Sequence, residues 1–214
     1  MNRAGWYSLV VVAVAALSLQ GCLPIAAVGV GAAVTSANDR RTSGTQIEDE
    51  GIELRASNRI GERWGDKVHF NVTSYNRAVL LTGEVPNESI KAEVEKLVTA
   101  ISNVRGITND IQVAGGTSLS ARANDSFLTS KVKARFVDGN LFNPFHVKVV
   151  TESGTVYLIG IVTEAEAKSA TEIARTTGGV KKVVRLFEYC KLTDDVCRPK
   201  QVKADETKRE AKPQ

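Results

Sequence analysis

An internal repeat is the feature of this sequence that most limits its fold. The segments "VTSYNRAVLLTGEV" (72–85) and "VTESGTVYLIGIV" (150–162) align with an offset of 77 residues, which places Gly83 opposite Gly160. The alignment continues downstream with an offset of 76 residues, so the repeated unit spans most of a small domain and occurs twice. Because each copy is one supersecondary unit, we expect two similar domains rather than one large one.

Each copy has the same predicted order of elements, αββαβ. Period-2 alternation of apolar residues and turns containing Asn or Gly predict a hairpin, and apolar residues spaced three and four apart predict the helices. The expected fold is α+β, with a three-stranded mixed sheet and two helices on one of its faces in each domain. The predicted helices cover 47–61, 87–101, 125–137 and 164–177, and the predicted strands cover 68–74, 78–85, 107–113, 146–151, 155–162 and 183–189.

Two strand residues have a predicted structural role. Gly83 and Gly160 lie inside the second strand of their copies, where glycine normally weakens a strand. We interpret both as positions where a helix approaches the sheet too closely to leave room for a Cβ atom.

The N-terminus is typical of an exported lipoprotein. Arg3 precedes an uncharged stretch, 6–19, which is shorter than the ~20 residues of a spanning helix. "LQGC" (19–22) resembles a bacterial lipobox, which implies lipidation at Cys22 with acyl chains such as palmitate; two or more chains anchor a protein firmly. An uncleaved membrane helix is the alternative, since 23–34 is also apolar. Leu23, in place of the Asp that retains such proteins in the inner membrane, implies the outer membrane.

Charge is distributed unevenly between the two copies. Residues 46–113 carry 8 Lys/Arg and 11 Asp/Glu, whereas residues 124–190 carry 9 and 7, so an anionic partner should prefer the second domain. The predicted organisation is a signal peptide (1–21), a flexible lipidated linker (22–45), a first domain (46–113), a linker (114–123), a second domain (124–190) and a disordered charged tail (191–214).

The cysteines and histidines offer little metal chemistry. Cys190 and Cys197 could form a disulfide in an oxidising compartment, and free thiols or a metal site are the less favoured alternatives because no histidine is near them in the sequence. His69 and His146 occupy matching positions in the two copies. They could share a metal only if the domains face each other there, so no metal site is predicted.

Two longer segments resemble a known family. "VYLIGIVTEAEAKSATEIARTTGGVKKV" resembles a BON domain, and "VLLTGEVPNESIKAEVEKLVTAISNVRGI" resembles a second, more divergent copy. Two such domains behind a lipobox, with "GTQIEDEGIELR" and "NDSFLTSKV", resemble the dual BON-domain outer-membrane lipoproteins. The resemblance implies a protein of the inner leaflet of the outer membrane that binds anionic phospholipid through its second domain. It also implies enrichment at the division septum, support of outer-membrane integrity and a link to β-barrel assembly.

The helix predicted over 125–137 is the candidate lipid-binding element, with Asn124 or Asp125 as its expected N-cap. An exposed Phe127 ring could enter the acyl boundary while lysines contact phosphate, and the resemblance favours this role. Alternatively, Phe127 covers the seam between the domains and the lysines are merely solvated. The equivalent helix of the first copy opens with acids at 48, 49, 50 and 53 and should be repelled by anionic lipid. The predicted phospholipid-binding residues are Phe127, Leu128, Lys131, Lys133, Ala134 and Val137.

The sequence contains no recognisable catalytic constellation and no phosphate-binding loop at the required spacing. We therefore expect no enzyme, no cofactor, no nucleic acid and no small-molecule substrate. Two functions from different classes remain. One is a module that binds anionic phospholipid membranes, and the other is a tethered adaptor that binds outer-membrane assembly or cell-wall machinery.

Overall fold

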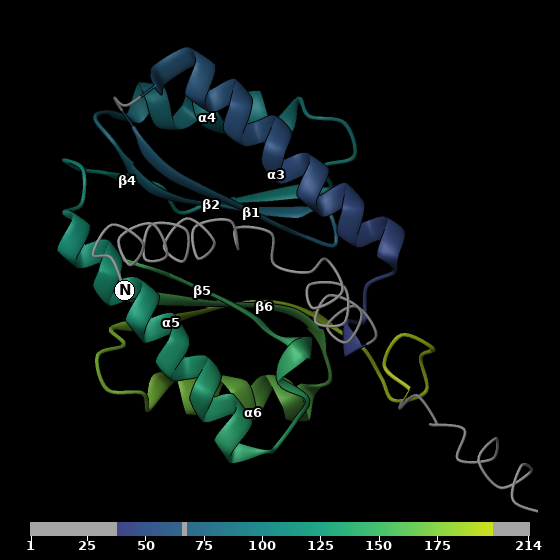
Figure 1. Ribbon diagram of the computed structural model, residues 1–214. Helices are drawn as coiled ribbons and strands as arrows, with labels where there is room; N and C mark the ends of the chain where they lie inside the picture. Colours follow the sequence, from purple (N-terminus) through teal and green to yellow (C-terminus); the bar gives the residue numbers. More distant parts are fainter. Residues whose placement is uncertain (1–37, 66–67, 199–214) are drawn as a thin grey trace, which may run out of the picture. The chain divides into compact units, whose positions relative to one another are not determined.

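The computed structural model describes residues 38–65 and 68–198 (Figure 1). The chain divides into two units, Met1–Asp39 and Arg40–Gln214, and both copies of the repeat lie within the second unit. The lipobox and Cys22 lie outside the described residues, so the predictions made for them stay predictions. Within the part of the chain that is described, no helix is both long enough and apolar enough to cross a membrane.

The first copy forms a mixed sheet with two helices. Its elements are α3 (Ser43–Trp64), β1 (His69–Tyr75), β2 (Ala78–Val85), α4 (Glu88–Thr99), β3 (Gly106–Asn109) and β4 (Gln112–Val113). Strand β2 is central, because it pairs antiparallel with β1 and parallel with both β3 and β4. The last predicted strand is therefore split in two. The split coincides with a side-chain hydrogen bond in which Asn109 Oδ1 accepts from the amide of Ile111 at 3.2 Å.

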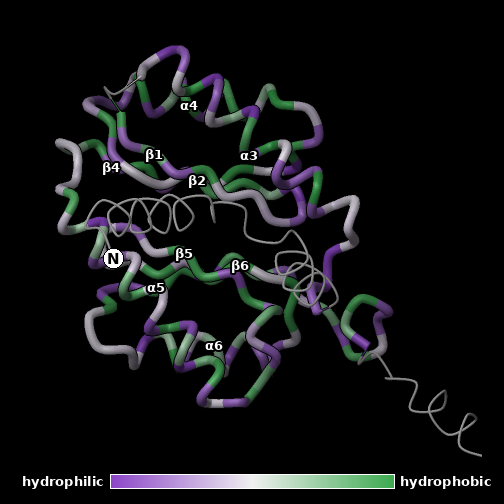
Figure 2. Tube along the Cα trace, viewed as in Figure 1, coloured by the Kyte–Doolittle hydropathy of each residue, from purple (hydrophilic) through white to green (hydrophobic). Residues whose placement is uncertain are grey.

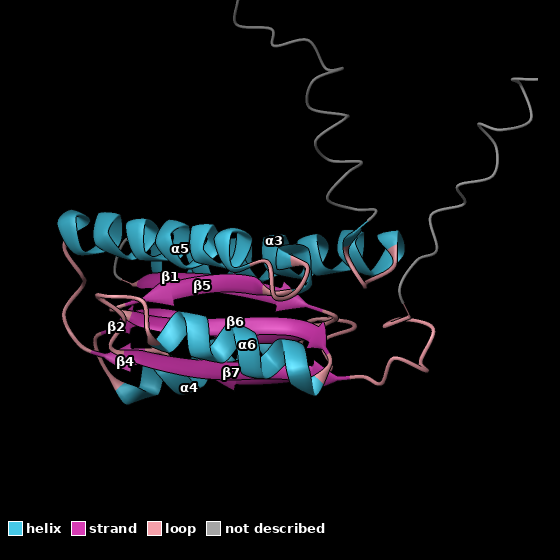
Figure 3. Cartoon of the chain, turned by 90° about the horizontal axis from the view of Figure 1, so that it is seen from below, coloured by secondary structure: helices cyan, strands magenta, loops and turns pink. Residues whose placement is uncertain are grey.

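The second copy repeats this order. Its elements are α5 (Leu119–Gly139), the 3₁₀ turn η2 (Pro144–His146), β5 (Lys148–Glu152), β6 (Thr155–Val162), α6 (Glu164–Arg175) and β7 (Lys182–Tyr189). Strand β6 pairs antiparallel with β5 and parallel with β7, while α5 packs along β5 and α6 along β6 and β7 (Figure 3). The predicted αββαβ order and α+β class are confirmed.

The first helix of each copy is longer than predicted, because capping residues outside the apolar stripe set where it begins. Helix α5 begins after Ser118, whose hydroxyl accepts from the amide of Ala121, so the predicted N-cap at Asn124 or Asp125 is wrong. The helix thereby extends over residues assigned to the linker 114–123. The predicted capping box at the start of α6 is present, with Thr163 and Glu166 bonding each other's backbone amides.

Asp125 has a different role from capping. It lies inside α5, is 6% exposed, and accepts hydrogen bonds from the amides of Ser153 and Gly154, both at 2.8 Å. These amides belong to the hairpin turn between β5 and β6. Asp49 of α3 does the same for the first hairpin, accepting from the amides of Asn76 and Arg77. In each domain, then, one buried carboxylate fastens the first helix to the turn of the sheet.

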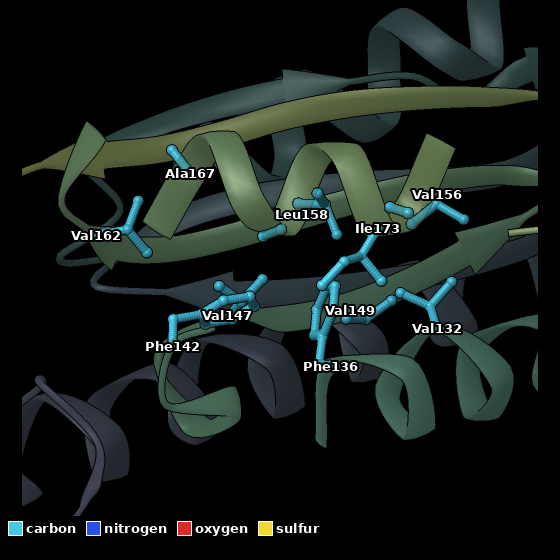
Figure 4. Packing of buried hydrophobic residues seen from close by; sticks show 12 residues of the cluster. Val132, Phe136, Phe142, Val147, Val149, Val156, Leu158, Val162, Ala167 and Ile173 are labelled. Carbon is cyan, nitrogen blue, oxygen red and sulfur yellow. The ribbon is translucent and has the colours of Figure 1, made fainter. Parts of the chain in front are cut away.

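Each domain has its own apolar core between its sheet and its helices. In the second domain, Phe136 and Val132 of α5 point toward Val149 of β5, and Ile173 of α6 reaches the same cluster (Figure 4). Phe136 also contacts Phe142 edge to face, with ring centroids 5.0 Å apart. Figure 2 shows apolar and polar residues alternating along the helix traces, as expected for helices that bury one face. The equivalent core of the first domain contains Ile52, Ala56, Ile60, Val79, Leu81, Val85, Val94, Val98, Ile101 and Ile111.

The strand glycines are needed for close backbone packing, but not against a helix. A Cβ atom on Gly160 would lie 2.2 Å from the carbonyl oxygen of His146, and one on Gly83 would lie 2.2 Å from that of His69. Gly83 also has a φ of 118°, which L-residues rarely adopt. Each glycine therefore accommodates backbone next to it, His69 at the start of β1 and His146 in η2 just before β5, and the predicted helix approach is wrong.

A third apolar cluster joins the two domains. Strand β6 contributes Tyr157, Ile159 and Ile161 from the face opposite the helices, and the first domain contributes Tyr75 and Leu80. Polar bonds flank this seam. The Tyr157 hydroxyl donates to Asp110 Oδ2 at 2.6 Å, and burial together with this bond raises the pKa of Tyr157 well above its usual value.

The first residues of the predicted tail are ordered. Residues 191–198 form hydrogen-bonded turns, and a disulfide joins Cys190 to Cys197 across 6.2 Å between Cα atoms. Cys197 is 2% exposed and packs into the cluster that joins the domains. The prediction of a disordered tail is therefore wrong for 191–198, because this turn buries one end of the disulfide. Residues 199–214 lie outside the described part.

Candidate lipid-facing surface

Helix α5 presents one face to the sheet and the other to solvent. Leu128, Val132 and Phe136 recur at intervals of four and are buried against the sheet. Phe127 and Val137 lie off this stripe, and their side chains are 64% and 63% exposed. Exposure of large apolar side chains beside lysines is the pattern of a membrane-surface helix, which makes this face the candidate functional site.

Most of the predicted lipid-binding residues lie on the exposed side of α5, and one does not. Phe127, Lys131, Lys133, Ala134 and Val137 are all exposed. Leu128 is 2% exposed and packs beside Gly179, so it belongs to the core and cannot contact lipid in this fold. We call the five exposed residues the α5 face.

The lysines of the α5 face differ in their engagement. Lys131 Nζ donates to the carbonyl oxygen of Gly178 at 3.0 Å, so this ammonium already has one partner in the loop after α6. Arg135, the next basic residue of the helix, is half-buried and donates to Ile173 O and Thr177 Oγ1. Its guanidinium therefore binds the C-terminal end of α6 and does not face solvent. Lys133 is exposed. Arg135 therefore has a structural role, whereas Lys133 and, in part, Lys131 are available at the surface of α5.

Two exposed apolar residues near α5 were missed at the sequence level. Leu141, directly after the helix, is 65% exposed, and Phe145, within η2, is 47% exposed. Both lie in the segment "GNLFNPFH", whose Asn and Pro residues mark a loop and break any helical periodicity. The available signal was the presence of three bulky apolar residues, Leu141, Phe142 and Phe145, in one short loop.

Three of the four acids at the start of the first-domain helix are less available than the sequence suggested, and the fourth, Glu50, is exposed. Asp49 is 2% exposed and forms an ion pair with Arg41 at 2.8 Å. Glu48 pairs with Arg55, and hydrogen bonds from Asn103 and Arg55 lower the pKa of Glu48. Glu53 accepts from the amide of Ser74 and from Lys148. The electrostatic contrast between the two helices is therefore smaller than formal charge indicates.

The residues just before α3 contact the second domain. Arg40 donates to Glu166 at 2.6 Å and to the carbonyl oxygen of Ile161, and the same Glu166 carboxylate lies 2.9 Å from His146 Nδ1. Burial alone would raise the pKa of Glu166, but the bonds from His146, Arg40 and the Thr163 amide hold it well below its usual value. An ionised Glu166 thus holds the end of the predicted linker against the second domain.

The fold and this surface define a class of protein, a tandem pair of αββαβ domains whose second copy exposes large apolar side chains on its first helix. The BON domain family matches the chain twice, at residues 48–115 and 124–191. The chain is 38% identical over 178 residues to a protein named outer membrane lipoprotein DolP from Haemophilus influenzae, covering 82% of this chain and 92% of that protein. The chain belongs to the BON-domain family and is a DolP-like dual BON-domain protein.

Other relatives share smaller parts of the chain. A 21 kDa hemolysin of Actinobacillus pleuropneumoniae is 32% identical and covers 71% of this chain and 79% of its own length. The osmotically-inducible protein Y of Escherichia coli is 30% identical, with 53% of this chain and 58% of its own length covered.

Proposed function

We propose that this protein is an outer-membrane lipoprotein, anchored by acyl chains on Cys22 in the inner leaflet. Its second BON domain binds anionic phospholipid through the α5 face and so supports outer-membrane integrity at the division septum. It carries out no catalysis. The lipobox and the name of the Haemophilus influenzae relative support the anchor and the location.

The observation that carries lipid binding is the exposure of Phe127 and Val137 on α5. Burying a Phe side chain in an apolar phase stabilises binding by about 1.5–3 kcal/mol, and each lysine near an anionic surface adds about 1 kcal/mol. Lys131 lies one helical turn from Phe127, and Lys133 lies one helical turn from Val137, so each exposed apolar side chain has a lysine beside it. The phosphate of a lipid headgroup is the anionic group that these lysines would bind.

Liposome flotation of the full chain tests this proposal, comparing anionic with zwitterionic vesicles. Phe127→Glu removes the apolar anchor and adds a negative charge, so association with anionic vesicles should fall at least tenfold. Leu54→Glu is a matched control, because Leu54 is 62% exposed on α3, the equivalent helix of the first domain. Equal flotation of wild type and Phe127→Glu in unlipidated form, where Cys22 is replaced by Ser, would refute the lipid proposal.

A second function is favoured by a specific feature of α3. Ile47 and Leu54 are 70% and 62% exposed and lie seven residues apart, on one side of the helix. Such a stripe suits contact with another protein, as expected for an adaptor that binds β-barrel assembly or cell-wall machinery. The adaptor predicts that Leu54→Glu abolishes co-purification of envelope partners while leaving flotation unchanged.

A further inference from the structure

Three potential metal ligands from both domains meet at one place. His69 begins β1, Glu84 lies directly opposite it on β2, and Glu152 ends β5 of the second domain. One ligand atom from each residue lies within 4.8 Å of those of the other two. His69 Nδ1 and Glu84 Oε2 are 2.9 Å apart. We call these three residues the interdomain triad.

The two carboxylates of the triad are buried without a full complement of positive charge. Glu84 is 5% exposed and Glu152 is 6% exposed. Among the described residues, the only ion pair within 4.0 Å of either carboxylate is the one between Glu84 and His69. Two carboxylates in so little solvent are costly to keep ionised, and a bound cation would stabilise both.

Neighbouring polar groups hold the carboxylates in position. Asn71 Nδ2 donates to Glu152 Oε2 at 2.7 Å, and Ser153 Oγ donates to Glu84 Oε1 at 3.3 Å. Outer hydrogen bonds of this kind orient the ligands of natural metal sites. Asn71 of the first domain donates to Glu152 of the second, and Ser153 of the second domain donates to Glu84 of the first. The arrangement therefore depends on both domains.

Two cavities adjoin the triad, and a further polar atom beside it lacks a partner. A cavity of about 720 Å³ is lined by His69, Glu84 and Arg122, and one of about 230 Å³ by His69, Glu152 and Arg122. Within the described ranges, Arg122 Nε is buried and has no hydrogen-bond partner. Arg122 pairs with neither carboxylate within 4.0 Å, so its Nε–H group is free to donate to a group that enters these cavities. A metal-bound water or anion would be such a group.

We propose that the interdomain triad binds a divalent transition-metal ion, with Zn²⁺ the best match. Imidazole and carboxylate are borderline and hard ligands, and three protein ligands plus one open position is a common Zn²⁺ arrangement. Metal–ligand bonds of ~2.0–2.1 Å place tetrahedral ligands ~3.3 Å apart, so small side-chain rotations suffice to close the site. The fourth position faces the cavities, where Arg122 can donate to the bound water or anion. The ion would link the two BON domains.

Calorimetric titration of the full chain with Zn²⁺ tests the site, in detergent and without a polyhistidine tag. Wild type should bind one ion per chain, and its thermal midpoint should rise with the metal. Glu152→Gln keeps the size and hydrogen bonds of the side chain but removes the charge, and His69→Gln removes the imidazole. Each should weaken binding at least tenfold. His146→Gln is the matched control, because His146 holds the equivalent place in the second domain but faces the single carboxylate Glu166.

The outcomes separate clearly. Loss of binding in the two triad variants, with binding by the His146 variant within twofold of wild type, supports the proposal. Absence of saturable binding by wild type overturns it, whatever the variants do. Equal binding by wild type and Glu152→Gln also overturns it, because the ion must then lie elsewhere. The experiment contains no lipid vesicles, so its failure leaves the lipid-binding proposal unaffected.

Discussion

Removing the Asp125 carboxylate should destabilise the second domain strongly. Asp125 accepts two charge-assisted hydrogen bonds at 2.8 Å from the amides of Ser153 and Gly154, and the Gly154 bond is fully buried. A hydrogen bond to a charged group contributes ~1.5–3 kcal/mol, so the two together contribute about 3–6 kcal/mol. Alanine favours a helix by at most ~0.7 kcal/mol more than aspartate, which offsets little of this loss. We expect Asp125→Ala to lower the free energy of unfolding by about 3–5 kcal/mol.

Urea denaturation followed by circular dichroism measures this loss. With an m-value of about 2 kcal/mol/M, a loss of 3 kcal/mol lowers the midpoint by ~1.5 M. Asp138→Ala is the matched control, because Asp138 is exposed on the same helix and should change stability by less than ~0.5 kcal/mol. A midpoint for Asp125→Ala within ~0.25 M of wild type would refute the idea that this carboxylate fastens the helix to the hairpin turn.

Two further predictions concern the strand glycine and the buried ion pair. Gly160→Val should unfold the second domain, because its Cβ would lie 2.2 Å from the His146 carbonyl oxygen; an unchanged melting curve would contradict this. The pKa of Glu166 is depressed in the folded protein, so its stabilising contribution is complete above the unfolded pKa of ~4.3 and is lost as the pH falls. Glu166→Gln should therefore have a lower free energy of unfolding than wild type at pH 7. Urea midpoints should also show that it loses less stability than wild type between pH 7 and pH 3. Parallel pH profiles of stability for the two proteins would argue against this role of Glu166.

The fold was largely predictable because its signals are local. A period-2 pattern with Asn and Gly turns specifies a hairpin, and the two copies support one another at a constant offset. Helix ends were less predictable, since Ser118 lies ten residues before Leu128, the first residue of the apolar stripe of α5. The repeated Asp49 and Asp125 were visible in the sequence, but their bonds reach hairpin turns more than 20 residues away.

The candidate surface was predictable in part. Helical periodicity places Phe127 off the buried stripe and Val137 near its edge, because burial in a helix follows its 3.6-residue repeat, and the structure exposes both side chains. The same periodicity puts Leu128 in the buried stripe, where the structure finds it. Leu141 and Phe145 follow no helical pattern, so only their three-dimensional exposure reveals them.

The amino-acid sequence alone determined the duplication, the αββαβ order and the position of Phe127 off the buried stripe of α5, because each follows from patterns that can be read along the chain. Only the tertiary structure decided how the copies join. Strand β6 is apolar on both faces, and the face away from its helices is buried against Tyr75 and Leu80 of the first domain. That same packing brings Glu152 to His69 and Glu84. Contacts between residues some 70 to 80 positions apart depend on how two finished surfaces fit together, and no local pattern encodes that fit.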